Sequence, residues 1–181
     1  YFGQRSYKVS YSVLIPEIAV NFRKTKTMKT RFLFLISFVS LLSQAQSFQL
    51  LDVVNNVVSG TTSTIQLTPT TQYTINYTVR NAAAQSKASR ACRVEISVLS
   101  GSWNAFIYDQ NQYPASVDTG TQTVTLQPNA TTNFNVIYYP GGNVGSSTIQ
   151  YCVFDPGNPT DNTCLTVIYQ SVPNGIPETL Q

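Results

Sequence analysis

The stretch NFNVIYYPGGNVGSSTIQYCVF, residues 133–154, governs what we expect of the fold because it contains two runs in which side chains alternate between two faces. Alternation with a period of two is typical of β-strands. The residues that share one face are Phe134, Val136 and Tyr138 in the first run and Ile149, Tyr151 and Val153 in the second. The Pro-Gly-Gly-Asn segment between the runs supplies turn formers, so we predict an antiparallel hairpin.

A second turn follows directly. The sequence DPGNPTDN at 155–162 combines prolines, which fix φ, with glycine and asparagines, which tolerate positive φ. A β-branched run from Thr163 to Tyr169 comes after it. The three runs therefore predict a meander of three antiparallel strands at the C-terminal end of the domain.

The rest of the chain after residue 45 has the same character. Strand-like runs cover residues 48–58, 64–68, 73–80, 92–99 and 117–126, and no segment shows a helical period. Residues 81–91 lack β-branched side chains and are expected to form a loop or a single helical turn. Short strands separated by turns predict an all-β fold, an antiparallel two-sheet β-sandwich with about seven to eight strands. A closed barrel is the alternative.

Charge divides the chain into two parts. Of its eleven basic residues, seven precede residue 32. From Gln46 onward, four basic residues face seven acidic ones, so this part has a net charge of −3. A domain of this sign attracts phosphate backbones weakly, so nucleic acid is not an expected partner.

Residues 28–45 have the three parts of a secretory signal peptide. A basic segment comes first, an apolar run covers residues 32–42, and small residues precede the expected cleavage after Ala45. A run of about eleven residues at about 1.5 Å each cannot cross a hydrocarbon core of about 30 Å, so a membrane span is not expected in the mature form. We expect a secreted or cell-surface protein in which residues 1–27 are upstream sequence outside the folded domain.

The residues of common catalytic and metal sites are missing or scattered. The chain has no histidine, which excludes Ser-His-Asp and Cys-His nucleophilic sites and histidine metal ligands. The acidic residues lie apart in the sequence, so we predict no enzyme activity, no catalytic residue, no cofactor and no metal. One alternative stays open, in which Asp155, Asn158, Asp161 and Asn162 supply oxygen ligands to calcium, although turn chemistry already explains this loop.

Two segments offer candidate binding residues. Residues 103–113 hold Trp103, Tyr108 and Tyr113 among amide and acidic side chains. Such a mixture can contact a glycan or a protein surface through apolar faces and directed hydrogen bonds. The alternative is that these aromatic residues belong to the core and to strand edges. The basic residues in and beside 81–91 could form a patch for an acidic glycan or phosphate, or simply belong to a solvated loop.

The three cysteines are an odd number for an exported chain, so one disulfide and one free thiol form the simplest expectation. A register that pairs Asp155 with Asp161 also sets Cys152 opposite Cys164, within bridging distance. These two are the disulfide candidates, although three pairings can be drawn. Cys92 is then expected to be a small buried residue, or to pair with another chain.

Several of these segments together resemble one known family. The segments are LQPNATTNFNV at 126–136, Tyr139-Pro140, Gly145 and DPGNP at 155–159. They are similar to the pattern of immunoglobulin-like domains in exported bacterial proteins that carry a C-terminal type IX secretion sorting domain. The resemblance implies an immunoglobulin-like domain over residues 46–170 and a linker over 171–181. It also implies a sorting domain beyond Gln181 that the export machinery would recognise.

Three hypotheses of function follow. The first is a non-catalytic module that binds or adheres to a glycan or protein outside the cell. The second is a passive spacer for the sorting domain, and the third is an accessory domain of a secreted hydrolase. A binding module should gather exposed aromatic residues at one end of the sandwich, whereas a spacer should bury Trp103. The few charges after Ala45 predict recognition that depends weakly on salt.

Overall fold

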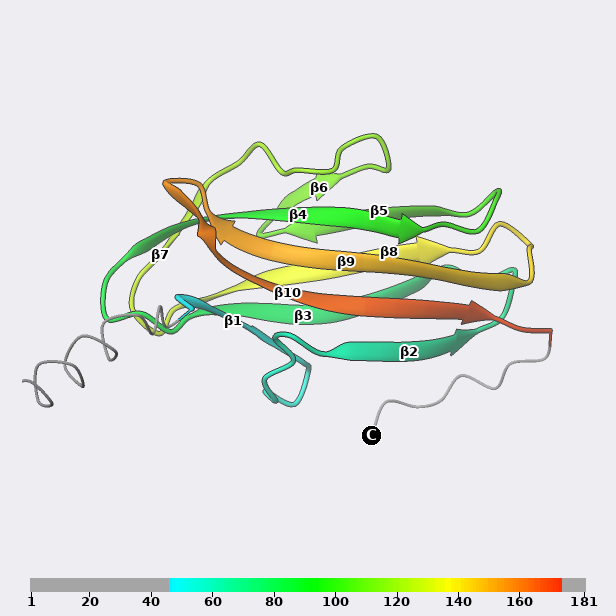
Figure 1. The fold of residues 1–181 in the computed structure, drawn as a ribbon, viewed down its shortest axis with the longest axis horizontal. Coiled ribbons are helices and arrows are strands. Elements are labelled where there is room, and N and C mark those ends of the chain that lie inside the picture. The colour runs from blue at the N-terminus through cyan, green and yellow to red at the C-terminus, as the bar shows by residue number, and fades with distance from the viewer. Residues whose placement is uncertain (1–45, 174–181) are drawn as a thin grey trace, which may run out of the picture. The chain divides into compact units, whose positions relative to one another are not determined.

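The computed structural model describes residues 46–173, which form ten β-strands in two five-stranded sheets (Figure 1). The strands are β1 (Phe48–Leu51), β2 (Thr62–Leu67), β3 (Tyr73–Asn81), β4 (Lys87–Ser97), β5 (Trp103–Tyr108), β6 (Asn111–Tyr113), β7 (Val124–Leu126), β8 (Thr131–Tyr139), β9 (Gly145–Asp155) and β10 (Asn158–Ser171). No helix occurs among these residues. The predicted two-sheet β-sandwich is confirmed, with two more strands than the larger expected number because the short strands β6 and β7 pair at sheet edges.

The two sheets have different strand orders. Sheet A has the order β1-β3-β8-β5-β6, and sheet B has the order β2-β10-β9-β4-β7. Neighbouring strands are antiparallel except for β2 and β10, which run parallel. The sandwich therefore has two flanks where the edges of the sheets meet, and these flanks differ in what covers them.

The predicted hairpin over residues 133–154 is wrong. Strand β8 lies in sheet A and β9 lies in sheet B, so the turn between them carries the chain across the core. The rings of Phe134 and Tyr151 meet edge to face at 6.2 Å, and the hydroxyls of Tyr138 and Ser147 lie 2.6 Å apart. Alternation shows which side chains face the core. Two such strands can bury these side chains either as neighbours in one sheet or as members of two facing sheets. The predicted meander is therefore reduced to the β9–β10 hairpin.

Three predicted boundaries also change. The strand expected over residues 48–58 ends at Leu51, and a turn with positive φ at Asn55 follows. The loop expected over 81–91 is confined to residues 82–86, between β3 and β4. The strand expected over 117–126 is confined to β7, and the residues before it bond to the edge of β4 through the Asp118 carbonyl and the Gly120 N–H.

Aromatic side chains from both sheets fill the core. Tyr138 of sheet A stacks on Tyr169 of sheet B at 4.2 Å, and the hydroxyls of Tyr151 and Tyr169 lie 3.1 Å apart. Burial raises the pKa of the Tyr151 and Tyr169 hydroxyls, so both stay neutral. Each large apolar side chain buried in this way stabilises the fold by about 1.5–3 kcal/mol. The core thus holds the two sheets together through side chains from both.

Strand β4 turns a different face to the core from the one its sequence favours. The inner face carries Ser89, Ala91 and Arg93, and all three are buried. Val94 and Ile96 are therefore on the outer face, where they are 50% and 59% exposed. Cys92 lies on this outer face too and is partly buried, so the expectation of a buried Cys92 holds only in part.

Candidate functional site

A groove lies along the flank where β2 of sheet B faces β3 of sheet A. Strand β2 is at the lower side of the view in Figure 1. The volume of the groove is about 300 Å³. Its apolar walls come from Ile65 of β2, Ile75 and Tyr77 of β3, Leu165 of β10, and Val53 and Val54 of the loop between β1 and β2. The only charged residue among those lining it is Asp52. A mainly apolar cleft with a few polar groups is typical of a binding site.

One wall of the groove is a sheet edge that lacks a neighbour among residues 46–173. Strand β1 pairs with residues 78–81 of β3, so within this range residues 73–77 have a partner only in β8. The backbone of Asn81 points toward β8, because it bonds to Asn129 and Ala130 at the start of that strand. Backbone direction alternates along a strand, so Thr74 and Asn76 turn their N–H and C=O groups to the open side.

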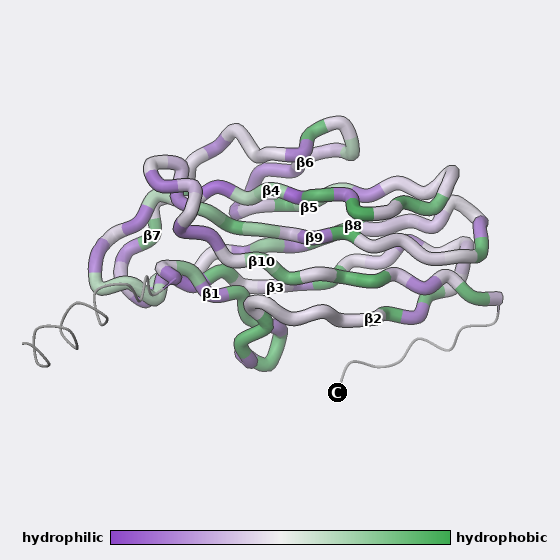
Figure 2. Tube along the Cα trace, in the orientation of Figure 1, coloured by the Kyte–Doolittle hydropathy of each residue, from purple (hydrophilic) through white to green (hydrophobic). Residues whose placement is uncertain are grey.

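The loop over residues 52–58 presents two exposed valines beside the groove. Val53 is 64% exposed and Val54 is 61% exposed. Figure 2 shows this loop as a largely apolar projection next to β1 and β2. One Asp52 carboxylate oxygen accepts the N–H groups of Val54 and Asn56 at 2.9 and 2.8 Å, and the other accepts the Asn56 amide at 3.0 Å. The loop conformation is therefore fixed, although its valines face solvent.

The ionisable groups of the groove do not resemble a catalytic pair. Desolvation acts to raise the pKa of Asp52, but the hydrogen bonds from Asn56 and Val54 outweigh it and hold that pKa below its usual value. Burial raises the pKa of Tyr77. At neutral pH Asp52 is thus a carboxylate whose oxygens accept hydrogen bonds from its own loop. Tyr77 is a neutral phenol. The groove offers shape, apolar surface and free backbone groups, and we find no nucleophile paired with a base among its lining residues.

The structure does not bring together the aromatic residues that were expected to contact a ligand. Tyr108 is 1% exposed and its hydroxyl lies 2.5 Å from Ser89 Oγ, while Tyr113 is buried and its hydroxyl accepts the Gln122 N–H. The hypothesis is wrong for both residues because alternation along β5 and β6 turns them into the core. Trp103 is 39% exposed and tilts against Tyr139 with ring centroids 6.4 Å apart.

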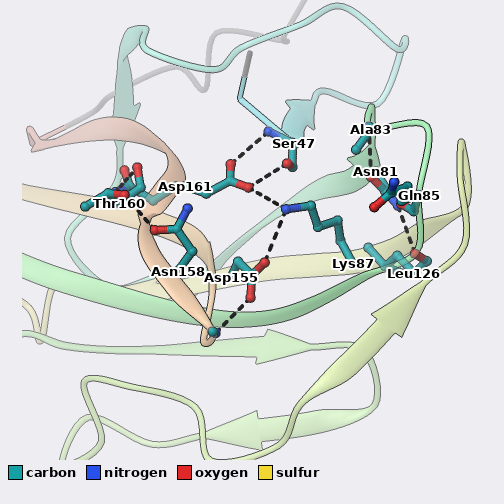
Figure 3. Close-up of polar contacts among 12 residues, drawn as sticks. Ser47, Asn81, Ala83, Gln85, Lys87, Leu126, Asp155, Asn158, Thr160 and Asp161 are labelled. Atoms are coloured by element: carbon teal, nitrogen blue, oxygen red, sulfur yellow. Dashed lines mark hydrogen bonds and ion pairs between the residues drawn. The ribbon is translucent and has the colours of Figure 1, made fainter. Parts of the chain in front are cut away.

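The acidic loop that could have held calcium instead surrounds an ammonium group. Lys87 Nζ lies 3.0 Å from Asp161 Oδ2 and 3.3 Å from Asp155 Oδ2 (Figure 3). Asp161 also accepts the N–H and the hydroxyl of Ser47. Burial acts to raise the pKa of Asp161, but the hydrogen bonds from Ser47 and Lys87 outweigh it and keep the pKa below its usual value. The calcium alternative is therefore not supported by this geometry.

The basic residues near residues 81–91 do not form a patch either. Lys87 is engaged by the two aspartates, and Arg93 is buried between the sheets. Asn81 orders the intervening loop by donating to the carbonyls of Gln85 and Leu126 and accepting the Ala83 N–H (Figure 3). These hydrogen bonds stabilise the loop between β3 and β4.

The cysteines Cys152 and Cys164 form a disulfide across the β9–β10 hairpin, with Cα atoms 4.0 Å apart. The pairing follows the register that the sequence predicts at this position, although a bulge places Asp155 opposite Asn158 instead of Asp161. Cys92 carries a free thiol, and burial raises its pKa.

No protein-family model matches the chain, and no curated protein does. Among solved structures, the chain is similar to the N-terminal domain of PorA, with a TM-score of 0.56, 10% identity, and coverage of 71% of this chain and 99% of that one. It is also similar to the secreted serine protease VesC from Vibrio cholerae (TM-score 0.47, 10% identity, 73% and 24% covered). A third similar structure is a PapD-like domain of human CEP192 (TM-score 0.41, 8% identity, 72% and 89% covered).

The likeness to the PorA domain shows the fold alone, a two-sheet β-sandwich. The described part of the chain contains no helix long and apolar enough to cross a membrane. The groove residues were not found by sequence reasoning. The one signal for them is the run Val53-Val54-Asn55-Asn56-Val57-Val58, in which the asparagines mark a tight loop between valines rather than an interruption within one strand.

Proposed function

We propose that the domain is a non-catalytic binding module that accepts an extended, mainly apolar segment of a partner protein as an added strand on the open edge of β3. The observation that carries this proposal is that residues 73–77 have no neighbour on one side in the described part of the chain, directly beside an apolar groove. Addition of a strand to an exposed edge is a recurring mode of peptide recognition.

The geometry suits an extended peptide. Thr74 and Asn76 offer free N–H and C=O groups two residues apart, which is the spacing at which an antiparallel or parallel partner strand forms its bonds. Alternate side chains of such a strand would point toward Ile75, Tyr77 and the valines of the loop. Main-chain bonds would supply affinity, and the groove would select apolar side chains.

A glycan is a poorer fit to this surface. Sugars stack on exposed aromatic rings, yet Tyr108 and Tyr113 are buried and the half-exposed Trp103 is tilted against Tyr139. The groove itself is nearly uncharged, since Asp52 is bound by its own loop. We therefore expect binding that changes little between low and physiological salt.

We also propose that the domain acts outside the cell, as part of an exported protein of the kind that the sequence resembles. Support comes from the Cys152–Cys164 disulfide, which persists in oxidising compartments, and from the signal-peptide pattern of residues 28–45. N-terminal sequencing of the protein from the medium or surface of its host should give a chain that begins near Gln46. A mature chain that retains residues 1–27 would contradict export by this route.

A peptide-binding experiment tests the groove. The purified chain would be titrated, by fluorescence polarisation, into a library of labelled twelve-residue peptides in which valine or isoleucine alternates with threonine. The Asn76→Pro variant removes a free N–H at the edge without removing a bond to β8, and the Val53→Ser, Val54→Ser pair removes the apolar loop surface. Both should lower affinity by about ten-fold, which corresponds to about 1.4 kcal/mol.

The matched control is the pair Val94→Ser, Ile96→Ser, which removes similar exposed apolar surface from the outer face of sheet B and should leave affinity unchanged. Circular dichroism would confirm that each variant is folded. If the folded wild-type chain retains no peptide, or if all variants bind equally, the groove proposal is wrong and the spacer hypothesis is preferred. Retention of a neutral glycan that is lost in Trp103→Ala would also overturn it.

A further inference from the structure

Three cysteines lie in one row across the outer face of sheet B. Cys92 of β4 is opposite Cys152 of β9, and Cys152 is opposite Cys164 of β10. Opposed residues of antiparallel strands project from the same face of a sheet. All three line one open cavity of about 320 Å³, with Phe154 among its walls. A free thiol therefore shares a cavity with a disulfide on the adjacent strands.

The hydrogen-bond pattern shows which pairs can be bridged. The Cys164 carbonyl accepts the Gly60 N–H, so its backbone points away from β9 and the Cys152–Cys164 pair is a non-hydrogen-bonded one. The N–H and C=O of Cys152 therefore point to its other neighbour, β4. This makes Cys92 and Cys152 a hydrogen-bonded pair, with Cα atoms about 5.5 Å apart. That separation lies within the disulfide range of about 4.4–6.8 Å. Cys92 and Cys164 are two strands apart, about 9.5 Å, and are out of range.

We propose that Cys92 is an exchange thiol that moves the disulfide from the Cys152–Cys164 pair to the Cys92–Cys152 pair. The Cys92 thiolate attacks Cys152 Sγ, and the new sulfur–sulfur bond forms as the bond to Cys164 breaks. Cys164 leaves as a thiolate and takes up the proton that Cys92 released. The step conserves the number of thiols and disulfides, so it needs no external oxidant or reductant.

The exchange changes which strands are tied together. The present bridge closes the β9–β10 hairpin, whose two cysteines are separated by 12 positions in the sequence. The alternative bridge ties β9 to β4, which is distant in the sequence, and frees a thiol on β10. The β9–β10 hairpin loop, which holds Asp161, would then depend on non-covalent contacts alone.

The surroundings of Cys92 set the pH at which the exchange runs. The cavity is lined by the three cysteines, Thr119, Phe154, Pro159 and Asn162, with no charged side chain among them. Arg90, on the same face of β4, donates to Thr123, and Asp118 is paired with Arg93. Burial raises the pKa of the Cys92 thiol. The reactive thiolate is scarce at neutral pH, and the rate should rise about ten-fold per pH unit until that pKa is reached.

Migration of a thiol label tests the exchange in the unaltered chain. The protein is incubated at pH 6 or pH 9, quenched in acid, labelled with N-ethylmaleimide and digested with chymotrypsin, which separates Cys152 from Cys164 by cleaving after Phe154. The label should be on Cys92 at pH 6 and divided between Cys92 and Cys164 at pH 9. Label that remains on Cys92 alone after prolonged incubation at pH 9 would overturn the proposal.

Two matched variants test the geometry independently. Cys164→Ser and Cys152→Ser both lack the native bridge and keep two thiols, and circular dichroism would show that both are folded. With oxidised glutathione, Cys164→Ser should form the Cys92–Cys152 bridge at least about ten-fold more readily than Cys152→Ser forms a Cys92–Cys164 bridge. Equal bridging in the two variants, or none in Cys164→Ser, would show that the row of cysteines is not an exchange pathway.

Discussion

The two flanks of the sandwich are built from the same kind of strand edge but are covered differently. On the flank formed by β4 and β5, residues between β6 and β7 bond to the edge of β4, and the Arg93 guanidinium fills the space between the sheets. Arg93 donates to the carbonyls of Asn104 and Ala115 and lies 3.3 Å from Asp118 Oδ1. On the flank formed by β2 and β3, the loop over residues 52–58 leaves a groove.

The difference shows that closure of a flank is a property of particular segments and not of the sandwich itself. The Arg93 N–H is bonded to the Asp118 carbonyl and the Gly120 N–H to the Ala91 carbonyl, so the edge of β4 is occupied. No comparable segment reaches Thr74 and Asn76 among the described residues. A sheet edge left open beside apolar surface is a place where another chain can pair, and natural proteins usually protect such edges.

The closed flank should be the more sensitive to substitution. Arg93→Leu leaves the buried carbonyl of Asn104 and the partly buried carbonyl of Ala115 without this donor, and an unsatisfied buried group costs about 1–3 kcal/mol. We expect the free energy of unfolding, measured in urea, to fall by about 3 kcal/mol. Arg90→Leu on the exposed face loses only the bond to Thr123 and should change stability by about 0.5 kcal/mol or less. Similar losses for the two variants would show that Arg93 does not hold this flank.

The cluster around Asp161 should have an intermediate effect, with a defined pH dependence. The pKa of Asp161 is below its ordinary value of 3.8 in the folded state. Its stabilisation is therefore complete above the unfolded-state pKa and is lost as the pH falls through the lower, folded-state value. Asp161→Asn should lose about 2 kcal/mol at pH 7 and show a weaker loss of stability in acid.

Asp155→Asn is the control for that prediction, because Asp155 contacts Lys87 and Gly157 but not Ser47. It should destabilise the domain less than Asp161→Asn at pH 7 and retain most of the acid sensitivity. The opposite ranking would mean that the bond to Ser47 contributes little.

The open flank should tolerate substitution best. Val53 and Val54 are largely exposed, so the double change to serine should alter the free energy of unfolding by less than about 0.5 kcal/mol in urea denaturation. The proposed function predicts that the same variant loses peptide affinity. A large drop in stability would instead show that the loop is part of the core packing and that the groove is not a free surface.

Much of the fold could be predicted from alternation alone. The inward positions of Ile75, Tyr77 and Phe134 follow directly from a period of two, and all three are buried. The pairing of strands could not be predicted in the same way, because β8 and β9 satisfy their pattern across the core as well as they would side by side. The alternation of Cys92, Val94 and Ile96 favours the wrong face of β4, because the buried Arg93 with its carbonyl partners takes the inner face.

The groove was beyond sequence reasoning for a related reason. Its existence depends on where β1 stops along β3 and on the turn at Asn55, and neither is encoded in the periodicity of the strands. The predicted site at Tyr108 and Tyr113 failed because aromatic residues among amides occur both on binding surfaces and in the core of a β-sandwich. Burial alone decides between the two, and it is a property of the folded chain.

Amide hydrogen exchange, followed residue by residue by NMR in the free protein, tests the difference between the flanks most directly. The Arg93 N–H is bonded to Asp118 O at 2.8 Å, whereas the Thr74 and Asn76 N–H groups face the open side of β3. We expect Thr74 and Asn76 to exchange at least about 100-fold faster than Arg93, and to slow when a bound peptide pairs with the edge. Protection of Thr74 and Asn76 equal to that of Arg93 in the free protein would show that the edge is already occupied and would contradict the account.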